Sequence, residues 1–251
     1  MSQPPRAART APGLPGAPEA RRRQDVPEVR GPVGAPDPHG PVETHITVDC
    51  PTHDVDRLAR WAAAEGLGFT HIVLARGTAR SQPMVTRRAT GTAAGQLDAA
   101  ERTVAALARA GFRAVRVKAE AAPWADGVPQ DDGAAAADQD PARHFEHHVK
   151  LLLPAGYDRD ALVALAVPHA AHVSWNARRR RADGREERFV TQRCHGVGRA
   201  TAETRLTALL ADLRGAGLEL LEVEREFVLY DSNLGLDEGW LATGAAPEAA
   251  P

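Results

Sequence analysis

The chain has 251 residues, of which 43% are hydrophobic, 25% charged and 4% aromatic, and its formal net charge is −2. This length suffices for one large domain or two small ones. The near-neutral charge argues against a strongly basic nucleic-acid-binding protein, and no run approaches 18 consecutive apolar residues, so we expect no membrane span. Two cysteines, Cys50 and Cys194, cannot form a disulfide framework or a four-thiolate zinc site.

The first ten residues, MSQPPRAART, lack the apolar core of a secretory signal, and together with the low cysteine count this predicts a soluble, cytoplasmic protein. Residues 1–41 are rich in Pro, Ala, Gly and Arg and have no hydrophobic period, so we expect a disordered tail. Residues 121–143 have the composition of a linker, and 241–251 are expected to form a second disordered tail.

The first half of the remaining chain, 42–120, predicts the order β-α-β-β-α-β. Strand 43–49 alternates polar and apolar residues, and a helix begins at Asp54, whose carboxylate can accept from the free amides of the first turn. Strands follow at 70–75 and 83–89. A second helix with one apolar stripe ends at Gly111, where a positive φ is favourable, and a fourth strand follows.

The second half, 144–240, repeats this order, with strands at 146–153, 171–177 and 188–194. Its first helix begins at Asp158, and its second helix ends at Gly217. The two halves also match in sequence at offsets of 101 to 106 residues, which indicates an internal duplication. The matches include Glu43-Thr44-His45-Ile46 with Glu146-His147-His148-Val149, Thr70-His71-Ile72 with Ala171-His172-Val173, and Val85-Thr86-Arg87-Arg88 with Val190-Thr191-Gln192-Arg193.

This order is that of a ferredoxin-like split βαβ unit. The predicted fold is therefore α+β: a tandem duplication of a ferredoxin-like βαββαβ unit, with antiparallel sheets that carry helices on one face. Strand alternation turns apolar residues toward the helices, namely Ile46, Val48, Val115, Val117, Val149, Leu151, Leu221 and Val223.

The opposite sheet faces are open and carry charged and polar residues instead. If the two faces turn toward each other, they form a charged, His-rich cleft; otherwise they are ordinary solvated faces. The first half contributes Glu43, His45, Thr47, His71, Thr86, Arg88, Arg116, Lys118 and Glu120. The second contributes Glu146, His148, Lys150, His172, Ser174, Asn176, Thr191, Arg193, His195, Glu222, Glu224 and Glu226.

Such a cleft favours a small phosphorylated or otherwise anionic ligand. Arginine binds phosphate oxygens through two donors and lysine as a point charge, so the predicted anion-binding residues are Arg88, Lys118, Lys150 and Arg193. The other predicted ligand-binding residues are Thr47, Thr86, Ser174, Asn176, Thr191 and His195. In a phosphoesterase or phosphohydrolase, the acid/base catalysts would be His45, His71, His148 and His172.

Two motifs resemble those of known phosphohydrolases. His45-Ile46-Thr47 and His172-Val173-Ser174 resemble the His-x-Thr/Ser pair of the two-histidine phosphoesterases, although here the repeat partner of His45 is His148. Glu222-Val223-Glu224-Arg225-Glu226 is similar to the Glu-x-Glu-x-Lys signature of the CYTH phosphohydrolases, which implies Mg²⁺ held by the acidic residues.

Other hypotheses stay open. A divalent metal, Zn²⁺ or Mn²⁺, could be held by the histidines together with Glu43, Glu120, Glu146, Glu224 and Glu226. A non-catalytic binding or scaffold module would carry the same faces. Nucleic acid is not expected beyond phosphate contacts, since Phe189 is the only aromatic residue placed on an open face. The segment from Tyr230 to Trp240 either crosses the cleft or, as we favour, packs on a sheet edge, with Asp231 and Asn233 as further candidates.

Overall fold

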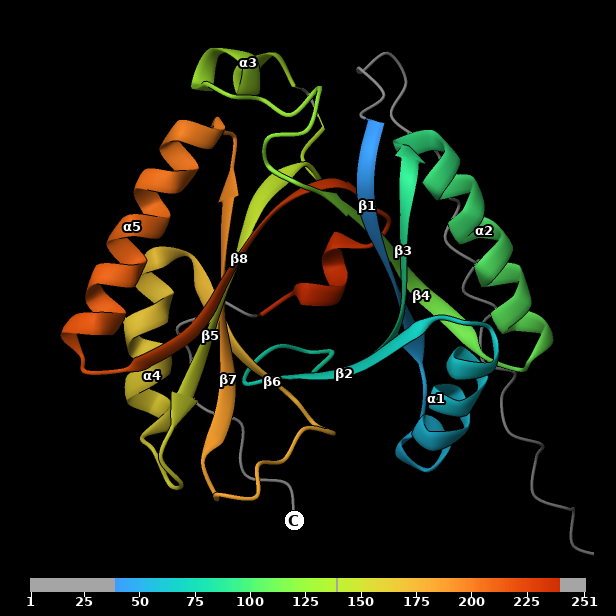
Figure 1. Ribbon diagram of the computed structural model, residues 1–251, viewed down its shortest axis with the longest axis horizontal. Helices are drawn as coiled ribbons and strands as arrows, with labels where there is room; N and C mark the ends of the chain where they lie inside the picture. Colours follow the sequence, from blue (N-terminus) through green and yellow to red (C-terminus); the bar gives the residue numbers. More distant parts are fainter. Residues whose placement is uncertain (1–38, 139, 240–251) are drawn as a thin grey trace, which may run out of the picture.

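The computed structural model describes residues 39–138 and 140–239 (Figure 1). The predicted tails lie outside these residues, except that the first strand begins at His39. The strands are β1 (His39–Asp49), β2 (Gly68–Leu74), β3 (Ser81–Thr92), β4 (Arg113–Ala121), β5 (His144–Leu153), β6 (Ala171–Asn176), β7 (Glu186–His195) and β8 (Glu219–Asp231). The α-helices are α1 (Val55–Ala64), α2 (Ala93–Arg109), α3 (Asp132–Ala137), α4 (Arg159–Ala166) and α5 (Arg199–Gly215), and the 3₁₀ helices are η1 (Thr52–Asp54), η2 (Val167–His169) and η3 (Leu234–Asp237).

The strands form one closed antiparallel barrel in the order β1-β3-β2-β6-β7-β5-β8-β4. Within each half the fourth strand pairs with the first, the first with the third and the third with the second. The expectation of two separate sheets is wrong, because β2 pairs with β6 and β4 pairs with β8 across the halves. Closure leaves no unpaired sheet edge among these strands. Hydrophobic alternation indicates which face of a strand is covered, but it does not indicate which strands of different halves pair.

The long helices cover the outside of the barrel, with α1 and α2 on one flank and α4 and α5 on the other (Figure 1). Each pair of helices packs on a buried apolar cluster, centred on Ile46, Leu58 and Leu107 in the first half and on Val149 and Leu209 in the second. Burying each such side chain contributes about 1.5–3 kcal/mol. In the described part of the chain, none of the helices has the length and apolar character that crossing a bilayer requires.

The predicted orientation is wrong at two positions of the fourth strands. β4 shifts register opposite Val48, so that Ala114 rather than Val115 pairs with Val48 and lies in the core. β8 shifts register opposite Leu151, and Leu221 is 43% exposed as a result. A β-bulge inserts one residue and reverses the alternation beyond it, and nothing in the periodicity of these short strands marks its place.

The predicted orientation of the side chains is also wrong in β2. The ladder places Gly68 of β2 opposite Thr86, and it places His172 of β6 opposite Thr191. The position equivalent to His172 is therefore Gly68, at an offset of 104 rather than the inferred 101. Because an odd shift moves every side chain to the other face of a strand, His71 points out of the barrel.

The segment 121–143 contains the short helix α3, which anchors it to the second half. Asp132 accepts hydrogen bonds from the backbone N–H of Gly198 (2.8 Å) and from Thr201 Oγ1 (2.9 Å), at the start of α5. A carboxylate at this place satisfies amides that have no partner within the helix.

The favoured expectation of edge packing is confirmed for the start of the C-terminal segment, since Tyr230 pairs with Ala119 of β4 and Ser232 N donates to Val117 O at 3.0 Å. β8 continues to Asp231, which pairs with Lys118 of β4, and the chain then turns inward as η3. Figure 1 shows η3 in red between the two halves. Asp237 at the end of η3 contacts Arg116 and Arg193.

Candidate functional site

The open strand faces of both halves line one cavity of about 240 Å³ inside the barrel. A closed barrel directs alternate side chains inward, so residues far apart in sequence meet there. Its apolar wall consists of Ile72, Leu74, Met84 and Phe189. The sequence-predicted site residues that line the cavity are Glu43, His45, Thr47, Arg88, Lys118, Glu120, Glu146, His148, His172, Ser174, Thr191, Arg193, Glu224 and Glu226.

Two predicted site residues, His71 and Asn176, do not line the cavity. Nε2 of His71 lies 2.9 Å from Ser81 Oγ in an exposed contact outside the barrel. Asn176 ends β6, and its Oδ1 accepts a hydrogen bond of 3.0 Å from the backbone N–H of Arg178. The prediction that His71 is an acid/base residue of the interior is therefore wrong, because its strand register was misjudged.

Two others lie on inward-facing positions but do not reach the cavity. Nζ of Lys150 is 3.2 Å from Glu187, a carboxylate that Arg179 also contacts. His195 stacks on His144 with ring centroids 4.2 Å apart, and both rings line a separate cavity of about 290 Å³. Lys150 therefore belongs to an ion-pair cluster beside the cavity.

The first Thr–His–Glu set consists of Thr86, His45 and Glu120, from β3, β1 and β4. Nδ1 of His45 is 2.9 Å from Thr86 Oγ1, and its Nε2 is 3.1 Å from Glu120 Oε2. Thr86 does not itself line the cavity and lies behind the imidazole. The contacts follow from the ladder, which aligns His45 with Thr86 on one side and with Lys118 on the other.

The second Thr–His–Glu set consists of Thr191, His148 and Glu226, from β7, β5 and β8. Nδ1 of His148 is 3.0 Å from Thr191 Oγ1, and its Nε2 is 3.1 Å from Glu226 Oε2. The distances repeat those of the first set. Each imidazole is thus held at both ring nitrogens, which fixes its orientation.

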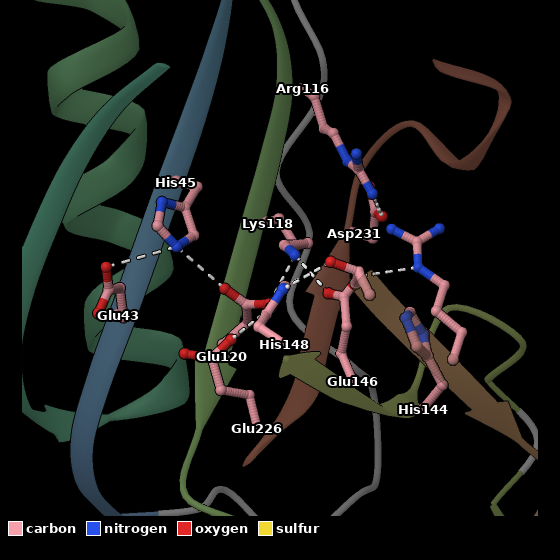
Figure 2. Close-up of polar contacts among 12 residues, drawn as sticks. Glu43, His45, Arg116, Lys118, Glu120, His144, Glu146, His148, Glu226 and Asp231 are labelled. Carbon is pink, nitrogen blue, oxygen red and sulfur yellow. Dashed lines mark hydrogen bonds and ion pairs between the residues drawn. The ribbon is translucent and has the colours of Figure 1, made fainter. Parts of the chain in front are cut away.

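The two sets meet inside the barrel. One potential ligand atom from each of Glu120, His148 and Glu226 lies within 4.8 Å of the others, and His45 joins this group through Glu120. Figure 2 shows these side chains converging from strands of both halves. One imidazole and two carboxylates thus converge, with a second imidazole in contact with Glu120, and mixed imidazole and carboxylate sets are typical of divalent transition-metal sites.

Lys118 links the two halves electrostatically. Its Nζ lies 2.6 Å from Glu120 Oε1 and 2.5 Å from Glu146 Oε2 (Figure 2). Burial alone would lower the pKa of Lys118, but the two carboxylates outweigh burial and raise that pKa above its ordinary value. The ammonium group is therefore permanently charged and neutralises carboxylates from both halves.

The same balance determines the charge of the neighbouring groups. Burial would raise the pKa of Glu120, but Lys118 and the hydrogen bond from His45 lower it to about 2. Burial would lower the pKa of His148, but Glu226 and Glu146 raise it to about 9. His148 is therefore cationic at neutral pH, and the protein already supplies a positive charge where its carboxylates converge.

The other cations of the cavity are also paired. Arg88 makes a two-point contact with Glu43, with both distances 2.7 Å, and Nε of Arg193 lies 2.9 Å from Glu146 Oε1. Among the described residues that line the cavity, five carboxylates face four Arg or Lys side chains. With His148 counted, whose pKa is raised to about 9, these charges balance, so an additional cation would have to replace the His148 proton.

Two buried residues, Arg116 and His144, have no role among the predicted site residues. Arg116 is 4% exposed and pairs through Nε with Asp231 Oδ1 at 2.9 Å. His144 lies four residues before His148 on β5, and this spacing places both on the same strand face. Alternation could therefore have identified His144, whose pKa burial lowers to about 3.

Comparisons with known proteins identify no family for this chain. No protein-family model matches it, and no curated protein is similar to it. Among solved structures, the acetolactate synthase small subunit from Thermotoga maritima has 11% identity, covers 76% of this chain and 95% of its own, and has a TM-score of 0.28. The siroheme decarboxylase NirDL, in complex with an iron-uroporphyrin III analogue, has 10% identity, covers 78% and 76%, and has a TM-score of 0.23. These similarities are too weak to support an argument about function.

Proposed function

We propose that the barrel interior binds one divalent metal ion between the two Thr–His–Glu sets. The ligands would be Nε2 of His45 and of His148 and carboxylate oxygens of Glu120 and Glu226. The observation that carries the proposal is the convergence of Glu120, His148 and Glu226 within 4.8 Å. A mixed imidazole and carboxylate set suits Zn²⁺, Mn²⁺ or Fe²⁺.

The threonine contacts support this assignment. A metal-binding histidine usually donates its second ring N–H to a polar partner, which fixes the tautomer and the direction of the free lone pair. Thr86 and Thr191 lie 2.9 and 3.0 Å from Nδ1 of His45 and His148. Each hydroxyl can accept the Nδ1 proton, so that each Nε2 lone pair is directed toward the carboxylates once the ion replaces the Nε2 proton.

The positive charge already present near the carboxylates also supports a cation. Burial disfavours a charged His148, but Glu226 and Glu146 outweigh it and raise its pKa to about 9, which favours the protonated imidazole at neutral pH. A divalent ion would take the place of that proton and satisfy both carboxylates at once. Metal binding at such a group releases a proton.

We further propose that the two halves arose by duplication of one βαββαβ unit. The support comes from structural equivalence: both fourth strands have a register shift, and both halves place a Thr–His–Glu set in the same relation to the ladder. In a single unit, one such set would face solvent from an open sheet. Joining two units brings the two sets together in one interior.

A phosphoester hydrolase is less well supported than a metal-binding protein. The cations predicted to hold phosphate, Arg88, Lys118 and Arg193, each pair with a carboxylate, and Lys150 lies beside the cavity. A cytoplasmic location is consistent with the two free thiols, Cys50 and Cys194.

Titration calorimetry of the full chain, stripped of metal with a chelator, tests the proposal. We expect Zn²⁺ and Mn²⁺ to bind at one ion per chain. The double variant Glu120→Gln/Glu226→Gln should lose more affinity than the about 10–100-fold typical of an outer-shell change. Glu224→Gln, which alters the same cavity outside the two sets, is the matched control and should bind as the wild type does. Absence of saturable binding, or equal affinity of the double variant, would refute the metal site.

A further inference from the structure

The carboxylate of Asp237 occupies a polar pocket formed by three side chains of the barrel. Its Oδ2 lies 2.8 Å from Nη1 of Arg116 and 3.0 Å from Nη1 of Arg193, and its Oδ1 accepts a hydrogen bond of 3.3 Å from Nε2 of Gln82. Arg116, Arg193 and Gln82 all line the central cavity. Two guanidinium groups and an amide therefore hold one carboxylate at the border of that cavity.

From Leu234 onward, the segment that carries Asp237 is weakly attached elsewhere. Among residues 232–239, Asp237 is the one buried residue, and Leu234 is 40% exposed. Ser232 and Asn233 are hydrogen-bonded to Val117 and Val115 of β4, and beyond them Thr78 N donates to Glu238 O at 3.2 Å. A segment held by a buried charge rather than by apolar packing belongs to the least stable parts of a fold.

The other carboxylates that pair with these arginines are fixed more firmly than Asp237. Asp231 pairs with Arg116, and Glu146 pairs with Arg193, but both acids belong to barrel strands. They cannot leave without breaking the sheet. Asp237 lies on η3, outside the barrel ladder, so η3 can move away while each arginine keeps a carboxylate partner. Displacing Asp237 therefore leaves neither guanidinium unpaired, which would be the costly outcome.

We infer that Arg116, Arg193 and Gln82 form a binding site for a carboxylate of a small-molecule ligand, and that Asp237 occupies this site in competition with the ligand. A ligand that enters the cavity would displace η3 and bind the same two guanidinium groups. Because Asp237 is tethered, it competes at a high effective concentration. The cavity of about 240 Å³ limits such a ligand to a small molecule.

A chain of ion pairs connects this carboxylate site to the proposed metal site. Arg193 contacts Glu146, Glu146 contacts Lys118, and Lys118 contacts Glu120. A ligand held by its carboxylate would thus lie on the same cavity wall as the ion. The carboxylate site does not depend on the ion, since none of Arg116, Arg193 and Gln82 belongs to the Thr–His–Glu sets.

The test is calorimetric titration of the metal-free full chain with succinate, a small carboxylate probe. Asp237→Asn removes the tethered competitor and should raise succinate affinity about tenfold or more. The matched control, Glu238→Gln, alters the neighbouring exposed acid and should bind as the wild type does. Adding Arg193→Gln to Asp237→Asn should abolish the gain. Equal affinity of the wild type and Asp237→Asn, or tighter binding of inorganic phosphate than of succinate, would overturn the inference.

Amide hydrogen exchange of the wild-type chain provides a second measurement that needs no variant. Succinate should accelerate exchange of the amides in 234–239 relative to the same concentration of chloride, since η3 must leave its place. Exchange in this segment that does not respond to succinate would also overturn the inference. Because both measurements use metal-free protein, their failure would leave the metal site standing, and failure of the metal titration would leave the carboxylate site standing.

Discussion

Opposite His45 the ladder places Lys118 of β4, and opposite His148 it places Glu224 of β8. The first half therefore supplies a cation at the position where the second half supplies an acid. Lys118 compensates Glu120 of its own half and Glu146 of the other, whereas desolvation raises the pKa of Glu224, which pairs with no lysine in this way. The two halves thus have equivalent Thr–His–Glu sets, but their charges at this position complement each other rather than repeat.

The largest expected effect comes from removing the cation that connects the halves. Lys118→Met leaves Glu120 and Glu146 buried with fewer partners and should lower the free energy of unfolding by about 3 kcal/mol. Lys150→Met is the matched control because Lys150 has a similar side-chain exposure, 11% against 12%. Its partner Glu187 keeps Arg179 and Arg181, so the loss should be about 1 kcal/mol or less. Urea unfolding measures both, and equal losses would contradict the central place of Lys118.

The second-largest expected effect is a loss of stability at acidic pH that comes from buried histidines of the second half. Burial and Arg193 lower the pKa of His172 well below its ordinary value, and burial lowers that of His144 to about 3 from 6.5. As the pH falls from 6.5 toward 3, the unfolded chain binds protons on these imidazoles before the folded chain does, so stability decreases. The first half has Gly68 at the place of His172. His172→Gln should therefore flatten the dependence of the urea midpoint on pH between 6.5 and 4.5, and an unchanged slope would refute this assignment.

The threonines should have a smaller and equal effect in both halves. Thr86→Val and Thr191→Val keep the side-chain volume but remove the hydroxyl beside Nδ1 of each imidazole. Each substitution should weaken Zn²⁺ binding about tenfold, at the low end of the range for an outer-shell partner. Calorimetric titration measures both. If only one threonine mattered, the ion would be held by one set alone.

The smallest expected effect is at the exposed ion pair of the first half. The side chain of Arg88 is 73% exposed, whereas that of its counterpart in the ladder, Arg193, is 13% exposed. Arg88→Gln should change stability by about 0.5 kcal/mol or less, since exposed ion pairs contribute little. Arg193→Gln should cost more, because it leaves Glu146 and Asp237 with one partner fewer. A thermal unfolding comparison in which both variants behave alike would contradict this difference in burial.

Much of the fold follows from local sequence signals. Alternation along 43–49 and 146–153, the helical stripes and the glycines at 111 and 217 give the elements and their order, and both glycines have a positive φ. Alternation also brings His45, Glu120, His148 and Glu226 to inward faces. It fails at Val115 and Leu221, where a bulge adds a residue, and at His71, where an offset of three residues moves the side chain to the other face.

Barrel closure and the C-terminal contacts could not be predicted in the same way. Pairing of β2 with β6 and of β4 with β8 depends on how two distant halves fit together, and no residue of these strands marks its partner. Asp237 meets Arg116 and Arg193 only because the chain turns inward after β8. Such contacts between residues more than 40 positions apart have no signature in a single sequence.

The most direct test of the central claim is anomalous diffraction from crystals of the full chain soaked in Zn²⁺ or Mn²⁺. We expect one strong anomalous peak inside the barrel, with Nε2 of His45 and of His148 and carboxylate oxygens of Glu120 and Glu226 at about 2.0–2.2 Å. A peak elsewhere on the chain, or a barrel in which Lys118 and the carboxylates keep their present contacts without an ion, would contradict the claim that the two halves build one metal site.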